Sequence, residues 1–237
     1  MRNTWTITLR ETRAYFVSPT AYVIITVFLG LTGWFFVGSM SEPFPDASVS
    51  SYLVPSTFIL VFLAPVLTMR LVAEERKLGT IELLFTSPVR DWQVIVGKYL
   101  AALTLFIGAS LLTFVYVVLL YRYGDPDTGP IVASYVGFLL FGAAALAIGL
   151  YTSSITSNQI VAAVVGFGIL LLLSVIHLAS GSVGVSIGNI LTGLSMAAHF
   201  SAFSRGIIAA SGVAYFTSVI VLFVFLAVRT FDVKRWT

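Results

Sequence analysis

Long apolar runs, each about as long as a lipid bilayer is thick, constrain this chain more than any other feature. A helix needs about 20 mostly apolar residues to cross the hydrocarbon core, where its backbone must satisfy its own hydrogen bonds. Only 10% of the 237 residues are charged, whereas soluble domains have about 25%. The chain is therefore predicted to be an all-α integral membrane protein, a single membrane domain over residues 1–237, with six spans at 20–40, 52–70, 98–121, 131–151, 160–179 and 212–229.

Two segments outside these spans are also expected to contact the membrane. Residues 1–18 carry Arg2, Arg10 and Arg13 among aromatic and apolar residues, a composition typical of a helix that lies in the interface. Residues 180–211 are apolar but interrupted by several glycines. We expect them to form short re-entrant helices at the outer face between spans five and six, with a seventh full span as the alternative.

The basic residues predict the orientation. Eleven Lys and Arg residues fall on the side that holds both termini, whereas Arg122 and Arg205 fall on the other. Cytoplasmic loops carry an excess of Lys and Arg, so both termini are expected in the cytoplasm. A seventh span would move the C-terminal basic residues to the outside, which argues against it.

The residues between spans two and three, 74–92, concentrate the polar chemistry that the rest of the chain avoids. Gly79 can adopt the left-handed backbone conformation that ends a helix at low energetic cost. Thr80 can cap a new helix, and Glu82 lies in its first turn, where the helix dipole favours an anion. Ser87-Pro88 would end this helix and begin the next. The stretch therefore predicts a short amphipathic helix on the cytoplasmic side, joined directly to two spans.

The residues do not support an enzyme. Glu74 and Glu75 lie on the opposite side of the membrane from His199 in the predicted topology, so they could not share a metal. Ser180 near His177 is a poor match to a membrane serine protease, and the Gly-Lys pair before span three lacks the first glycine of a phosphate-binding loop. The chain has no cysteine, which excludes thiol chemistry. No catalytic residue, metal site or cofactor is expected in this chain.

Several motifs, taken in order, resemble the cytoplasmic loop of the type-2 permeases of ATP-binding cassette (ABC) transporters. They are Ala73-Glu-Glu-Arg-Lys-Leu-Gly-Thr-Ile-Glu-Leu-Leu84, then Ser87-Pro88-Val89, Trp92 and Gly97-Lys98-Tyr99-Leu100. The whole chain is also similar to the short permeases of the gliding-motility and nitrous-oxide-reductase accessory group. That similarity rests on Met69-Arg70, the Thr156 to Gln159 turn, His199-Phe200 and Arg205-Gly206.

The resemblance implies a permease in the inner (plasma) membrane of a prokaryote, driven by two cytoplasmic ABC ATPase subunits that bind the ATP and Mg. It also implies a second permease copy or a paralogue, and accessory membrane or periplasmic subunits could join them; no nucleic acid is expected. The residues that would contact the ATPase are Glu74, Glu75, Gly79, Thr80, Glu82 and Leu83. His199, Phe200 and Arg205 are candidates for an outer gate or a partner contact.

The function expected from this resemblance is ATP-driven transport, with export as the direction, through a pathway at the interface of a permease dimer. Two alternatives remain open. The chain could anchor an ATPase at the membrane without moving a substrate, or it could be a stand-alone channel. The channel predicts activity without nucleotide, and the anchor predicts ATPase binding without a nucleotide-dependent cavity.

Overall fold

The computed structural model describes residues 2–41, 48–79, 90–182 and 184–233, and these residues are almost entirely helical. Within them, six helical stretches are long and apolar enough to cross a membrane, which agrees with the predicted number of spans. The elements are α1 (Arg2–Val17), α2 (Pro19–Met40), α3 (Ser50–Thr68), α4 (Arg70–Lys77), α6 (Asp91–Leu112), α7 (Phe114–Tyr123), α8 (Thr128–Ile155), α9 (Gln159–Val175), the 3-10 helix η1 (Ile176–Ser182), α10 (Val185–Leu194), α11 (Met196–Ser204) and α12 (Ala210–Val233).

The second and third spans extend beyond their predicted limits on the side of the 74–92 stretch. The second candidate span runs through α3 and α4 over Ser50–Lys77, and the third runs through α6 and α7 over Asp91–Tyr123. Both are interrupted. Met69 separates α3 from α4, and Thr113 separates α6 from α7, where its hydroxyl donates to the carbonyl of Ser110 at 2.6 Å.

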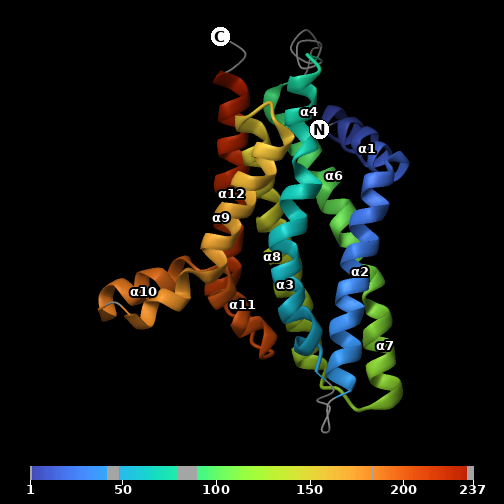
Figure 1. The fold of residues 1–237 in the computed structure, drawn as a ribbon, viewed down its shortest axis with the longest axis vertical. Helices are drawn as coiled ribbons and strands as arrows, with labels where there is room; N and C mark the ends of the chain where they lie inside the picture. The colour runs from blue at the N-terminus through green and yellow to red at the C-terminus, as the bar shows by residue number, and fades with distance from the viewer. Residues whose placement is uncertain (1, 42–47, 80–89, 183, 234–237) are drawn as a thin grey trace.

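The span α8 forms the centre of the bundle and packs against α3, α9 and α12 (Figure 1). Its buried face is rich in Ala and Gly, and small residues allow membrane helices to approach closely. A Cβ atom at Gly142 would overlap the ring of Phe106, and one at Gly149 would overlap the hydroxyl of Thr68. The close packing of α3 and α6 on α8 therefore depends on these glycines.

Both ends of the chain lie at one end of the bundle. Figure 1 shows α1, α4, the start of α6 and the end of α12 together there; we call this the terminal end. The helix α1 lies across the spans rather than along them, as expected for an interfacial helix. It exposes Trp5, Leu9 and Phe16 and buries Thr4 and Thr8 against the bundle. The described residues of the 74–92 stretch, at the end of α4 and the start of α6, lie at this same end.

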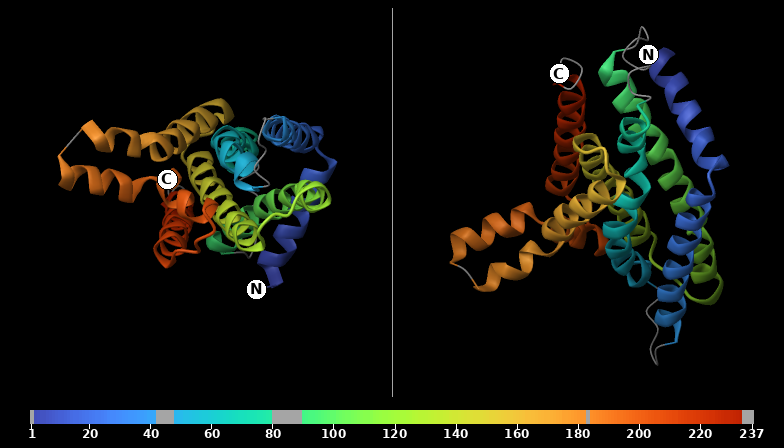
Figure 2. Two further views of the ribbon diagram at one scale, coloured as in Figure 1. Left: turned by 90° about the horizontal axis from the view of Figure 1, so that it is seen from below. Right: turned by 45° about the horizontal axis from the view of Figure 1, so that its top comes forward.

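Between the last two spans the chain forms the short helices α10 and α11, and their re-entrant placement in the membrane stays a prediction. In the views of Figures 1 and 2, η1 and α10 project sideways from the bundle as a hairpin. The next helix, α11, returns to the bundle and is fixed there by Phe203, which is fully buried. Its ring fills a notch at Gly137 of α8 and Gly212 of α12, since a Cβ atom at either position would collide with it.

Candidate functional site

The helix α4 carries the first residues of the 74–92 stretch and is oriented by one apolar face. Leu71, Val72 and Ala73 are buried against the bundle. The helix ends at Lys77 and is followed closely by Gly79, which has φ +70° and whose N–H donates to the carbonyl of Arg76 at 3.2 Å. This left-handed conformation is accessible to Gly and unfavourable for most other residues. Gly79 therefore sets the direction in which the chain leaves α4.

Lys98, in the third turn of α6, is the most unusual residue at the terminal end, because its charged side chain is only 2% exposed. Its ammonium group lies 2.7 Å from Oε1 of Glu75 on α4 and 3.2 Å from Oε1 of Glu11 on α1. Both carboxylate side chains are 17% exposed. One buried cation thus joins the interfacial helix, the end of span two and the start of span three; we call these three residues the Lys98 triad.

The triad carries a formal charge of −1, and each of its buried charges is stabilised by pairing with an opposite charge. Removing charges from water costs several kcal/mol per ion, and only close pairing with good hydrogen bonds offsets this cost. Each member is consequently required by the others. Nearby, burial raises the pKa of the Tyr15 phenol, helped by the negative charge of Glu11. Tyr15 therefore stays neutral and donates a hydrogen bond to the carbonyl of Leu67 at 3.0 Å.

The helix α1 also touches α6 closely just before Lys98. The hydroxyl of Thr8 donates to the carbonyl of Gly97 at 3.3 Å. A Cβ atom at Gly97 would lie 2.8 Å from a methyl carbon of Ile7 and 3.2 Å from the carbonyl oxygen of Thr4. The absence of a side chain at Gly97 is therefore what allows α1 to approach α6 this closely, and the two helices form one packed unit.

Glu74 faces a different environment from its neighbour Glu75. It pairs with Arg70 one turn earlier at 3.5 Å, and both side chains are about two-fifths exposed (39% and 43%). These two residues line a cavity of about 210 Å³ between α1 and α4, together with Glu11 and Tyr15. Of the two adjacent glutamates, Glu74 is therefore accessible to a partner, whereas Glu75 is directed into the Lys98 triad.

The structure brings only part of the predicted ATPase-contact residues into view. Glu74, Glu75 and Gly79 lie together at the end of α4. Thr80, Glu82 and Leu83 lie outside the described residues, so the short helix expected there stays a prediction. Glu11 and Lys98 were missed. The signal available in the sequence was the spacing of Thr4, Thr8, Glu11 and Tyr15, which places a carboxylate on the packed face of α1.

The predicted outer residues do not converge on one site. His199 is half-buried on α11, stacks on the ring of Tyr215 at a centroid distance of 4.0 Å, and donates from Nδ1 to the carbonyl of Ser195 at 2.9 Å. Phe200 is buried in the core against Phe141. Arg205 is exposed at the end of α11. His199 also lines a cavity of about 300 Å³ next to α10.

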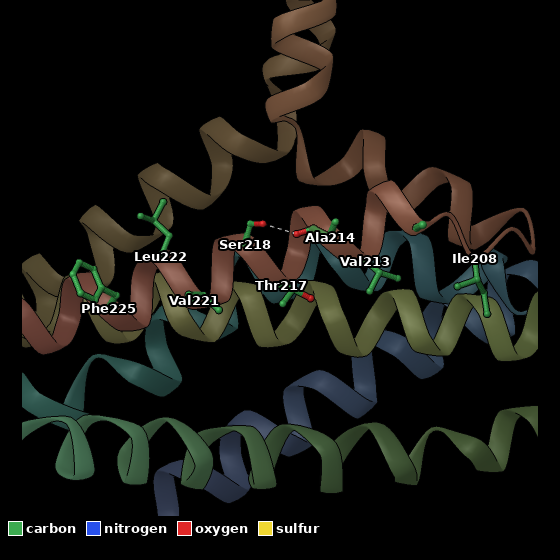
Figure 3. Close-up of a pocket in the computed structure, with 9 residues that line it drawn as sticks. Ile208, Val213, Ala214, Thr217, Ser218, Val221, Leu222 and Phe225 are labelled. Carbon is green, nitrogen blue, oxygen red and sulfur yellow. Dashed lines mark hydrogen bonds between the residues drawn. The ribbon is translucent and has the colours of Figure 1, made fainter.

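A groove of about 940 Å³ runs along α12 and is shown in Figure 3. It is lined mainly by apolar side chains, among them Val213, Val221 and Phe225. Two hydroxyl residues, Thr217 and Ser218, also line it, and the Ser218 hydroxyl donates to the carbonyl of Ala214 in its own helix at 2.7 Å. No lining residue is charged. Elsewhere within the described ranges, no three His, Asp or Glu side chains come together to hold a metal ion.

Within the described residues, six packed helical stretches that are long and apolar enough to cross a membrane define a multi-pass membrane protein. Comparison with known families is consistent with this class. Residues 37–231 match the family described as ABC-2 family transporter protein. The chain belongs to this family, and it is a transmembrane subunit of a transporter.

Two curated relatives support the same conclusion over part of the chain. The probable multidrug ABC transporter permease YbhR of Escherichia coli K12 is 29% identical over 117 residues, which are 48% of this chain and 31% of the relative. The protein of the same name from Escherichia coli O157:H7 matches to the same extent. The matched region spans about a third of the length of these relatives.

Proposed function

We propose that this chain is the permease subunit of an ATP-driven exporter, powered by two cytoplasmic ATPase subunits that contact residues 74–92. The observation that carries the proposal is the Lys98 triad. It joins α1, α4 and α6 close to both ends of the 74–92 stretch. The chain that contains this arrangement belongs to the ABC-2 family. The terminal end faces the cytoplasm, in line with the distribution of basic residues.

The geometry explains why a push on this stretch would be transmitted. A flexible loop would absorb a movement, whereas α4 and α6 are joined within two turns of the stretch by the ammonium group of Lys98. Closure of the ATPase pair would displace the stretch, and α1, α4 and α6 would follow as one unit. The docking surface would consist of Glu74, Gly79, Thr80, Glu82 and Leu83. Glu75 would fix the helix α4, from which this surface extends, to Lys98 of α6.

The substrate pathway would lie at the interface between two permease copies. The groove along α12 is the surface we assign to one wall of this pathway, because it is long, open and uncharged. A pathway without fixed charge favours an amphipathic or lipid-like cargo, or a segment of polypeptide, over a small ion. His199 and Arg205 would lie near its outer end, where a gate or an accessory subunit could contact them.

Charge reversal at Glu82 tests the proposal. When the permease is reconstituted in liposomes with its ATPase, Glu82→Lys is expected to lower permease-stimulated ATP hydrolysis by at least about tenfold, because like charges in an interface cost several kcal/mol. Stimulated hydrolysis is measured as phosphate release with and without the permease. The matched control is Glu42→Lys in the loop predicted to lie outside, which should leave stimulation unchanged. Equal stimulation by both variants would argue against the docking surface.

A further inference from the structure

The junction between α3 and α4 leaves backbone groups that the two helices cannot satisfy by themselves. The first N–H groups of a helix have no partner within it and are usually capped by a preceding side chain. The residue before α4 is Met69, whose side chain makes no capping hydrogen bond. In a bilayer such groups need a partner from a neighbouring helix.

Ser153 of α8 provides that partner. Its hydroxyl accepts hydrogen bonds from the N–H groups of Val72 at 3.2 Å and Ala73 at 3.1 Å, and it donates to the carbonyl of Met69 at 2.9 Å. A hydroxyl has one donor and two acceptor positions. All three are used at this junction, and the residue is fully buried. Ser153 therefore caps α4 from another helix.

The surroundings show what this cap connects. On the near side of the junction, the end of α3 is locked onto α8, because Thr68 is fully buried in the space left by Gly149. On the far side, α4 carries Glu75 of the Lys98 triad. The hydroxyl of Ser153 thus joins α4, which begins the 74–92 stretch, to α8. Among the candidate spans of the described residues, α8 has the largest fraction of buried residues.

We propose that Ser153 is a positioning residue that transmits movement of α4 to α8, so that the ATPase stroke reaches the central span as well as spans two and three. This proposal rests on the proposed function. In this proposal α4 rotates about Met69 while the end of α3 stays fixed on α8. The three hydrogen bonds to Ser153 then make α8 move with α4.

Hydrogen exchange of the permease in complex with its ATPase tests the proposal, with and without trapped nucleotide. Ser153→Ala is expected to make the amides of Val72 and Ala73 exchange about fivefold faster, as for the loss of a helix cap. It should also abolish the nucleotide-dependent change in exchange at the inner end of α8, residues 150–155, while α4 still responds. The matched control is Ser154→Ala. Ser154 is equally buried but bonds only within its own helix, to the carbonyl of Tyr151 at 2.7 Å.

The possible outcomes separate the two proposals. If residues 150–155 respond to nucleotide in Ser153→Ala as they do in the unaltered chain, Ser153 is only a structural cap and the inference is overturned, whereas the proposed function stands. If Val72 and Ala73 exchange at unaltered rates in Ser153→Ala, the cap itself is refuted. If the unaltered permease binds no ATPase, or α4 does not respond to nucleotide, the proposed function fails and this inference fails with it.

Discussion

Replacement of Lys98 by methionine is expected to lower the free energy of unfolding by about 3–5 kcal/mol, the cost of leaving a buried charge without its partner. Methionine retains the length and the apolar stem of lysine, so the packing of α6 changes little. It leaves the carboxylates of Glu11 and Glu75 facing each other without the cation between them. The measurement is unfolding of the detergent-solubilised permease, followed by tryptophan fluorescence during titration with a denaturing detergent.

Two further variants isolate the ion pairing. Lys77→Met removes an exposed lysine from the end of α4 and should change stability by less than about 1 kcal/mol, since exposed charges contribute little. The triple variant Lys98→Met, Glu11→Gln, Glu75→Gln removes all three charges and should recover most of the loss. If Lys98→Met were as stable as the unaltered protein, the triad would not stabilise the packing of α1, α4 and α6 at the terminal end.

Replacement of Gly79 by proline is expected to reduce permease-stimulated ATP hydrolysis more than about tenfold without preventing membrane insertion. Proline fixes φ near −65° and has no N–H group. Gly79 has φ +70° and donates a hydrogen bond to Arg76. The substitution would therefore redirect the chain where it leaves α4 and move the docking surface away from the ATPase. Stimulated hydrolysis is measured in liposomes at equal amounts of inserted permease.

Asparagine at the same position separates backbone direction from side-chain size. A Cβ atom at Gly79 would meet no atom of the described residues within 4 Å, so a larger side chain fits among them. Asn also tolerates the left-handed conformation better than most residues. Gly79→Asn should therefore retain most of the stimulation. Loss of stimulation in Gly79→Asn, or full stimulation in Gly79→Pro, would contradict the role assigned to this turn.

The number of spans could be predicted from the sequence because it depends on the number and length of the apolar runs. The limits of spans two and three could not. The hydropathy pattern ends span two before Glu75 and begins span three at Lys98, yet the second candidate span continues through Glu75 and the third begins at Asp91. A charged residue can be carried at the end of a span when it is paired with opposite charges on neighbouring helices, and this pairing depends on tertiary contacts.

The candidate site was likewise predictable only in part. The motif order locates the 74–92 stretch, but it does not distinguish the adjacent glutamates Glu74 and Glu75. Their difference follows from helix geometry, since a step of one residue rotates a side chain by about 100° around α4. The role of Ser153 could not be predicted from the sequence, because a serine near the end of a span more often bonds to its own helix, as Ser154 does.

The central claim is that a separate ATPase drives this chain through residues 74–92. The most direct measurement is purification of the permease through a single affinity tag, in mild detergent, from cells that express it together with the genes that flank it. We predict that an ABC ATPase co-purifies in stoichiometric amount with the unaltered chain and is lost from Glu82→Lys. Recovery of the permease alone under several mild conditions, together with flux in liposomes without nucleotide, would contradict the claim and favour a channel.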